Sequence, residues 1–141
     1  MTSARADSSS SEISAIRSKL APEPVGPYSQ AVIWGAWIFA SGQIPLDPAT
    51  GKLVEGPVEA QTERVIENLA AVLKEGGSSL DRVVRSTVYL TDLSLFPRVN
   101  EVYARYFRGD PAPARATVGV AALPLGAQVE IDAIAIAIAE N

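Results

Sequence analysis

Hydrophobic positions recur with helical spacing in two segments of the chain. Between residues 58 and 73, apolar side chains return at steps of three and four, charged side chains fill the other positions, and Gly76 and Gly77 follow. This spacing places the apolar side chains on one face of an amphipathic helix, and a glycine pair is a common end signal. The same spacing returns over residues 95–107. We therefore predict two amphipathic helices that pack against one core.

Other segments have the composition of β-strands. Residues 83–90 and 114–120 are rich in β-branched side chains, and residues 31–40 contain two apolar runs separated by Gly35. A last strand is predicted over residues 128–138, after a turn-like segment at 123–126. The predicted order is two or three strands, a helix, a strand, a helix and two strands. This order favours an α+β fold with a mixed sheet and two helices packed on one face.

The last predicted strand is apolar on both faces. Residues 133–138 alternate alanine and isoleucine, whereas a sheet with one wet face alternates apolar and polar residues. Two helices cover one face only, and leaving apolar surface in water costs roughly 25 cal/mol per Å². We expect a homo-oligomer, in preference to a monomer that covers this face with its own loops.

Composition and charge narrow the classes of protein. The chain has 141 residues, of which 48% are hydrophobic and 20% are charged, enough for one domain with a core. Residues 1–15 are polar and serine-rich, so we expect a disordered leader followed by a single domain over 16–141. The chain has neither a secretory h-region nor a membrane-spanning apolar run, so we expect a cytoplasmic location without membrane contact. A net charge of −4 argues against binding nucleic acid.

The chain contains no cysteine and no histidine. This excludes disulfides, thiol nucleophiles, Ser-His-Asp triads and zinc sites built from those residues, although a metal held only by carboxylates stays open. We predict neither a metal site nor a cofactor. Proton transfer in an enzyme of this composition must use Asp, Glu, Tyr, Lys, the backbone or water.

Three positions are candidates for chemistry. Arg115 begins a predicted apolar strand, and its planar guanidinium fits a carboxylate with two hydrogen bonds. Glu130 shares a strand face with Asp132 and isoleucines, so partial burial should raise the pKa of its carboxyl. The alternative is that Glu130 pairs with an arginine across a subunit contact. Gly42, at the end of a predicted strand, indicates a bulge or a close approach of a ligand or backbone.

Six sequence blocks carry a resemblance to a known family. They are APEPVGPYSQAV at 21–32, FASGQIPLDPATG at 39–51, AQTERVIENL at 60–69, VNEVYARYF at 99–107, PAR at 113–115 and VEIDAIA at 129–135. In order and spacing they resemble the RidA family, also called YjgF, over about residues 16–139. The resemblance implies a chorismate mutase-like fold and a homotrimer, in which the sheets form a central barrel and a cleft lies at each subunit interface.

The resemblance also implies an activity and a set of site residues. The activity is the hydrolysis of reactive 2-imino or 2-enamino acids, such as 2-iminobutanoate and 2-iminopropanoate, to 2-oxo acids and ammonia without a cofactor. Arg115 matches the arginine that clamps the substrate carboxylate, and Glu130 matches the acid that positions water or carries the proton. The implied substrate-binding residues are Tyr28, Ser41, Gly42, Asn100 and Thr117. Thr117 stands where many members have cysteine, so chemistry attributed to that thiol does not apply here.

Two alternatives to this activity remain open at the level of sequence. The same cleft could bind a small carboxylate as a regulatory module without turning it over, although the presence of Arg115 favours the enzyme. A deaminase of the same fold could also serve one pathway and act on a larger enamine or imine.

Overall fold

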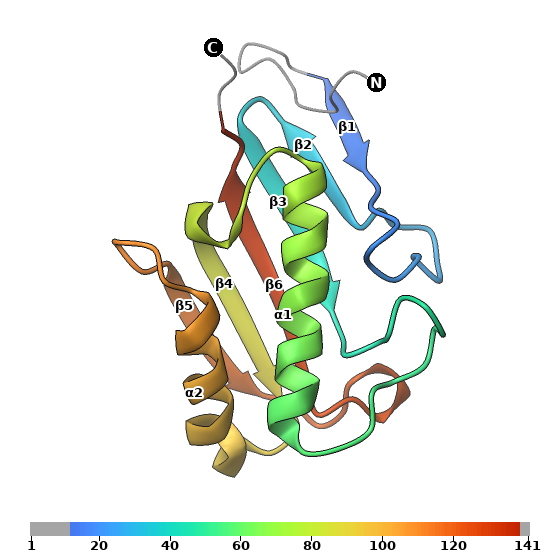
Figure 1. The fold of residues 1–141 in the computed structure, drawn as a ribbon, viewed down its shortest axis with the longest axis vertical. Coiled ribbons are helices and arrows are strands. Elements are labelled where there is room, and N and C mark those ends of the chain that lie inside the picture. Colours follow the sequence, from blue (N-terminus) through green and yellow to red (C-terminus); the bar gives the residue numbers. More distant parts are fainter. Residues whose placement is uncertain (1–11, 139–141) are drawn as a thin grey trace.

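The computed structural model describes residues 12–138, which form one six-stranded sheet with two α-helices on one of its faces (Figure 1). The sequence-predicted α+β class and the two helices on one face are confirmed. In chain order the strands and helices are β1 (Ile13–Ile16), β2 (Ala31–Trp34), β3 (Trp37–Gln43), α1 (Val58–Glu75), β4 (Val83–Leu90), α2 (Phe96–Tyr106), β5 (Ala114–Gly119) and β6 (Val129–Ile136). Short 3-10 helices lie at Leu80–Arg82, Leu93–Leu95 and Pro124–Gly126.

The strand order in the sheet is β1-β2-β3-β6-β4-β5. All neighbouring strands are antiparallel except β4 and β5, which are parallel and are connected through α2. The C-terminal strand β6 therefore lies between β3 and β4, near the centre of the sheet. A central strand has a neighbour along each edge, so its backbone groups are hydrogen-bonded on both sides.

The core lies between the sheet and α1. This helix contacts β3 and β6 and buries Val65, Ile66, Leu69, Val72 and Leu73 completely, which is the apolar stripe that its sequence predicts. The helix ends at Glu75 and is followed by Gly76, where a Cβ would lie 3.0 Å from Ile38 Cδ1 and closer still to Ile16 Cδ1. Neither helix in the described part of the chain is long and apolar enough to cross a membrane.

A row of acidic side chains on α1 joins this helix to α2. Glu59 accepts two hydrogen bonds from Arg98, at 2.6 and 2.8 Å, and these hold its pKa at about 2. One turn and two turns further along, Glu63 pairs with Arg105 and Glu67 accepts from the Tyr106 hydroxyl. Three glutamates spaced four residues apart on α1 thus link the exposed sides of the two helices.

The folded part begins earlier than the sequence indicates. The predicted leader ends at residue 15, but β1 starts at Ile13 and pairs with β2 along its whole length. Only Ile16 of this strand is buried, so the strand is held by backbone hydrogen bonds at the sheet edge and leaves little hydrophobic signal. The rest of the predicted leader, residues 1–11, lies outside the described residues.

The face of the sheet opposite the helices carries an apolar stripe. Trp34 lies opposite Trp37 in the β2–β3 register, and Phe39 lies between Val32 and Ile134. The exposed fractions of Trp34, Trp37 and Phe39 are 49%, 42% and 42%, so this side of the sheet is open to solvent in a single subunit. We name this surface, which also includes Ile134 and Ile136 of β6, the open face.

Candidate functional site

A pocket of about 600 Å³ lies beside the carboxylate of Glu130. Glu130 lies on β6 opposite Tyr89 of β4, on the open face and beyond its apolar stripe. On the other side of β6, the register of β3 shifts between Ala40 and Gln43. Side chains from the N-terminal loop and from the Pro124–Gly126 turn complete the walls. Four of the sequence-predicted residues line this pocket: Tyr28, Ser41, Gly42 and Glu130.

Gly42 is required by the position of Glu130. A Cβ at residue 42 would lie 2.8 Å from Glu130 Cδ and would overlap its carboxylate oxygen. The missing side chain therefore leaves the space in which the carboxylate rests against β3. Of the two alternatives that the sequence indicated at Gly42, the bulge is confirmed by the register shift of β3. The group that packs against this glycine is the side chain of Glu130.

The electrostatic surroundings of Glu130 favour its protonated form. Burial raises the pKa of this carboxyl above its usual value, and the negative charge of Asp132 raises it further. Asp132 accepts a hydrogen bond of 3.0 Å from the Tyr89 hydroxyl. Burial and this bond in turn raise the pKa of Tyr89. The upward direction expected from sequence for the pKa of Glu130 is confirmed, and a raised pKa is common among active-site carboxyls that take up and return protons.

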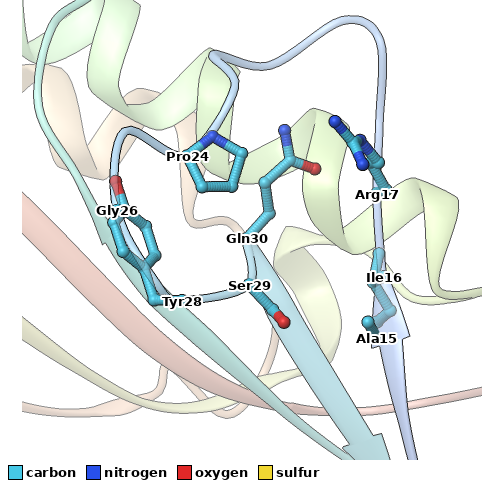
Figure 2. Close-up of a pocket in the computed structure, with 8 residues that line it drawn as sticks. All are labelled: Ala15, Ile16, Arg17, Pro24, Gly26, Tyr28, Ser29 and Gln30. Atoms are coloured by element: carbon cyan, nitrogen blue, oxygen red, sulfur yellow. The ribbon is translucent and has the colours of Figure 1, made fainter.

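The N-terminal wall of the pocket is tied down by Gln30, a residue that sequence reasoning missed. Its buried side chain accepts from the Ser18 amide at 2.6 Å and donates to the carbonyls of Ser18 at 3.1 Å and of Pro22 at 2.9 Å. Figure 2 shows this side chain directed toward the loop that carries Pro24. The sequence did contain a signal for this role, because Gln30 lies between a turn and an apolar strand. A side-chain amide that is buried at such a place is expected to bond to the backbone.

Ser41 and Tyr28 continue this wall. The Ser41 hydroxyl donates to the Ser29 carbonyl at 2.7 Å, and the Ser41 amide donates to the Gln30 carbonyl at 2.9 Å. These bonds join the loop to the end of β3. Figure 2, which draws a neighbouring pocket that shares Tyr28 and Gln30, shows the Tyr28 ring beside the turn at Gly26. The ring is half exposed and also lines the Glu130 pocket. The Ser41 hydroxyl is therefore engaged in holding the wall.

Arg115 is held in a separate place, at the edge strand β5. Its guanidinium carbon lies 4.7 Å from the centre of the Tyr103 ring and 5.2 Å from that of Phe96. Its Nη1 donates to Asn100 Oδ1 at 2.8 Å. The two ring contacts and the hydrogen bond fix the orientation of the guanidinium, and its other N–H groups stay exposed. The structure thus brings together Arg115 and Asn100, both implied by the resemblance.

The strand register puts Arg115 and Glu130 on opposite faces of the sheet. Arg115 pairs with Ser86, whose buried hydroxyl bonds to Tyr103 on the helix side. Thr117 pairs with Val88 of the core, so it shares the helix side with Arg115. Glu130 is on the open face. The predicted site residues therefore form two groups, and a single subunit does not bring them into one pocket.

No metal site accompanies either group in the described residues. Within residues 12–138, no three aspartate or glutamate side chains gather as they would around an ion.

Comparison with known proteins identifies the family. A model of the family described as Endoribonuclease L-PSP matches residues 18–137. The chain belongs to the RidA (L-PSP) family. It is 62% identical over 124 residues to "Protein DfrA" of Myxococcus xanthus, covering 86% of this chain and 94% of that one. It is 48% identical over 120 residues to "Reactive Intermediate Deaminase A, chloroplastic" of Arabidopsis thaliana, covering 85% of this chain and 64% of that one.

Solved structures of similar proteins share the fold. A putative endoribonuclease from Thermotoga maritima superposes with a TM-score of 0.85 at 53% identity, covering 89% of this chain and 98% of that chain. The crystal structure of E. coli TdcF with bound serine has a TM-score of 0.82 at 39% identity, covering 87% of this chain and 98% of that chain. These matches confirm the RidA family membership that the sequence motifs predict.

Proposed function

We propose that this RidA protein hydrolyses 2-imino or 2-enamino acids to 2-oxo acids and ammonia. The observation that carries the proposal is the half-buried Glu130 carboxylate, with its raised pKa, in a pocket of about 600 Å³. A relative bears the name Reactive Intermediate Deaminase A, and TdcF holds serine, an amino acid with a carboxylate. The net charge of −4 gives no support to action on RNA.

In the proposed reaction Glu130 moves two protons. It first accepts a proton from water as the water oxygen bonds to the imine carbon, and it passes that proton to the imine nitrogen. It then takes the proton of the new hydroxyl and passes it to the amine, which leaves as ammonia while the carbonyl forms. Such acid–base assistance is worth about 10²–10⁴-fold, and these steps require neither a covalent intermediate nor a metal.

The carboxylate of the substrate is assigned to Arg115 of a neighbouring subunit. Within one chain Arg115 and Glu130 face opposite ways, so a second copy is needed to bring the two groups together. The open face supports such an assembly, because Trp34, Trp37 and Phe39 are left about half exposed. We infer a homotrimer in which open faces are buried in a central barrel. Asn100 then holds the arginine, while Thr117 lies beside it on β5.

A trapping assay tests this function. An amino-acid oxidase generates the imine, semicarbazide captures what survives, and the protein competes with the trap. We expect the wild type to suppress the captured product and both Arg115→Ala and Glu130→Gln to fail. Arg105→Ala is the matched control, since Arg105 is an exposed arginine of α2 that pairs with Glu63. If Glu130→Gln suppresses the captured product as well as the wild type does, Glu130 does not transfer protons in the reaction. If the wild type does not suppress it, the pocket binds a ligand without hydrolysing it.

A further inference from the structure

One wall of the Glu130 pocket contains a leucine in a strained backbone conformation. Leu125 has φ 59° and ψ 19°, and it is followed by Gly126 at φ 77°. Apart from glycines, Leu125 is the one described residue with a positive φ. A branched side chain in the left-handed region is strained, because its Cβ crowds the backbone, and glycine is the usual residue there. Such strain clusters where function requires a particular geometry.

The strained turn does not bury the leucine side chain. Leu125 is 69% exposed and lines the pocket together with Pro124. The N-terminal loop lines the same pocket with Val25, 85% exposed, and with the ring of Tyr28. Apolar side chains on two separate loops are thus left in water beside one cavity.

Most polar side chains of the pocket already have partners within the chain, so the apolar wall formed by Leu125, Val25 and Tyr28 is available to an apolar part of a ligand. Glu23, which also lines the pocket, is paired with Arg17 at 2.6 Å, so its charge is countered. The amide of Gln30 is occupied by loop backbone. Among the described residues that line the pocket, Glu130, beside Gly42, is the carboxylate without an ion pair. A ligand held with its reacting carbon near Glu130 would therefore direct its remaining substituent along an apolar surface.

We propose that Leu125 is a specificity-determining residue that selects 2-imino acids with branched or aromatic apolar side chains over the smallest ones. The inference rests on the proposed function and deepens it. A cavity of about 600 Å³ lies within the range of about 300–1,000 Å³ found for sites of much larger ligands than 2-iminopropanoate. Contact with an apolar substituent removes the leucine and valine side chains from water, which favours such substrates in binding and in the transition state.

The test compares two imines in the same trapping assay, one made by an oxidase from leucine and the other from alanine. For Leu125→Ala we expect kcat/KM for the leucine-derived imine to fall about tenfold or more, while that for the alanine-derived imine stays unchanged. Leu125→Gly should lose the same selectivity without a fall in Tm, because glycine relieves the strained φ. Leu93→Ala is the matched control, since Leu93 is 53% exposed and does not line this pocket.

Each other outcome overturns the inference in a recognisable way. If Leu125→Ala lowers both rates equally, or neither, Leu125 does not set specificity while the deaminase function stands. If sedimentation shows that Leu125→Ala dissociates the assembly, the residue serves a subunit contact instead. If the wild type clears neither imine, the proposed function falls and this inference falls with it.

Discussion

Gly42 and Glu130 occupy one space between two neighbouring strands. The carboxylate of Glu130 rests where a side chain at position 42 would begin, and the register shift of β3 makes the room for it. Gly42 does not have a positive φ, so the requirement for glycine here comes from this contact and not from the backbone conformation. The absence of a side chain at Gly42 therefore determines where the Glu130 carboxylate lies.

Replacing Gly42 by alanine should displace the carboxylate while leaving the fold intact. The added methyl group meets the far end of a flexible side chain, which can turn away, so Tm should change little. A reacting group moved by about 1 Å can cost about 10² in rate, and we expect a loss of that order in kcat/KM. Thermal unfolding and the trapping assay on the same preparation check both parts.

Gly119→Ala is the control for this variant. Gly119 is also a strand glycine without a positive φ, and an added Cβ there meets a side-chain carbon of Leu93 at 3.0 Å. It should have a similar effect on Tm and no effect on kcat/KM. If the two variants lose activity equally, the contact between Gly42 and Glu130 has no special role.

The pKa of Glu130 makes a prediction for stability against pH. Because this pKa is raised above its ordinary value of 4.5, the folded protein binds the proton more tightly than the unfolded chain does. Folding stability therefore declines as pH rises above 4.5 through the window that ends at the folded pKa. Glu130→Gln removes this penalty. We expect its Tm to exceed that of the wild type at neutral pH, and the difference to disappear below pH 4.5 in parallel melts.

Asp132 supplies a second way to test the same group. Removing its charge in Asp132→Asn lowers the pKa of Glu130, since repulsion by Asp132 is one of the two causes of the upward shift. If Glu130 acts as the base, the acid limb of the kcat/KM profile should move to lower pH. Tyr89→Phe keeps the Asp132 charge and removes only the 3.0 Å hydrogen bond, so it should not move the limb downward. If the acid limb does not move in Asp132→Asn, it reports the titration of a group other than Glu130.

Much of the fold follows from periodicity in the sequence. The apolar stripe of α1, the two-faced apolar strand β6 and the strand β4 lie within a few residues of their predicted bounds, because a regular spacing or run of apolar residues marks each of them in the sequence. The strand β1 has one buried residue and is held by edge hydrogen bonds, so hydrophobicity did not indicate it. Its start at Ile13 could not be read from a serine-rich segment.

The candidate site was predictable in its residues but not in its geometry. Family motifs pointed to Arg115 and Glu130, and strand parity placed Glu130 on the face that carries Ile134 and Ile136. The separation of the two groups depends on the parallel pairing of β4 with β5, which a linear sequence does not reveal. Leu125 was treated as part of a turn, since the sign of its φ is invisible in the sequence.

The support beneath Arg115 can be tested through stability. Tyr103 stacks under the guanidinium, and its hydroxyl shares a hydrogen bond of 2.7 Å with the fully buried Ser86. Tyr103→Phe keeps the ring and leaves the Ser86 hydroxyl without this partner, which should cost about 1–2 kcal/mol in the free energy of unfolding. Activity should persist because the aromatic surface remains.

Tyr106→Phe is the matched control in denaturant unfolding. The Tyr106 hydroxyl donates to Glu67 at an exposed position, so its removal should change the free energy of unfolding by less than about 0.5 kcal/mol. Equal losses in the two variants would show that the Ser86–Tyr103 bond contributes nothing particular to the stability of the α2–β4 contact.

The proposed division of the site between two subunits predicts complementation. Arg115→Ala and Glu130→Gln should each be inactive alone, because every site lacks one of its two groups. When equal amounts are unfolded, mixed and refolded together, about one quarter of the sites in a cyclic assembly pair an intact Glu130 with an intact Arg115. We therefore expect roughly a quarter of the wild-type activity from the mixture in the trapping assay. A mixture that stays inactive, although sedimentation shows mixed assemblies, would mean that Arg115 and Glu130 do not act on the same substrate.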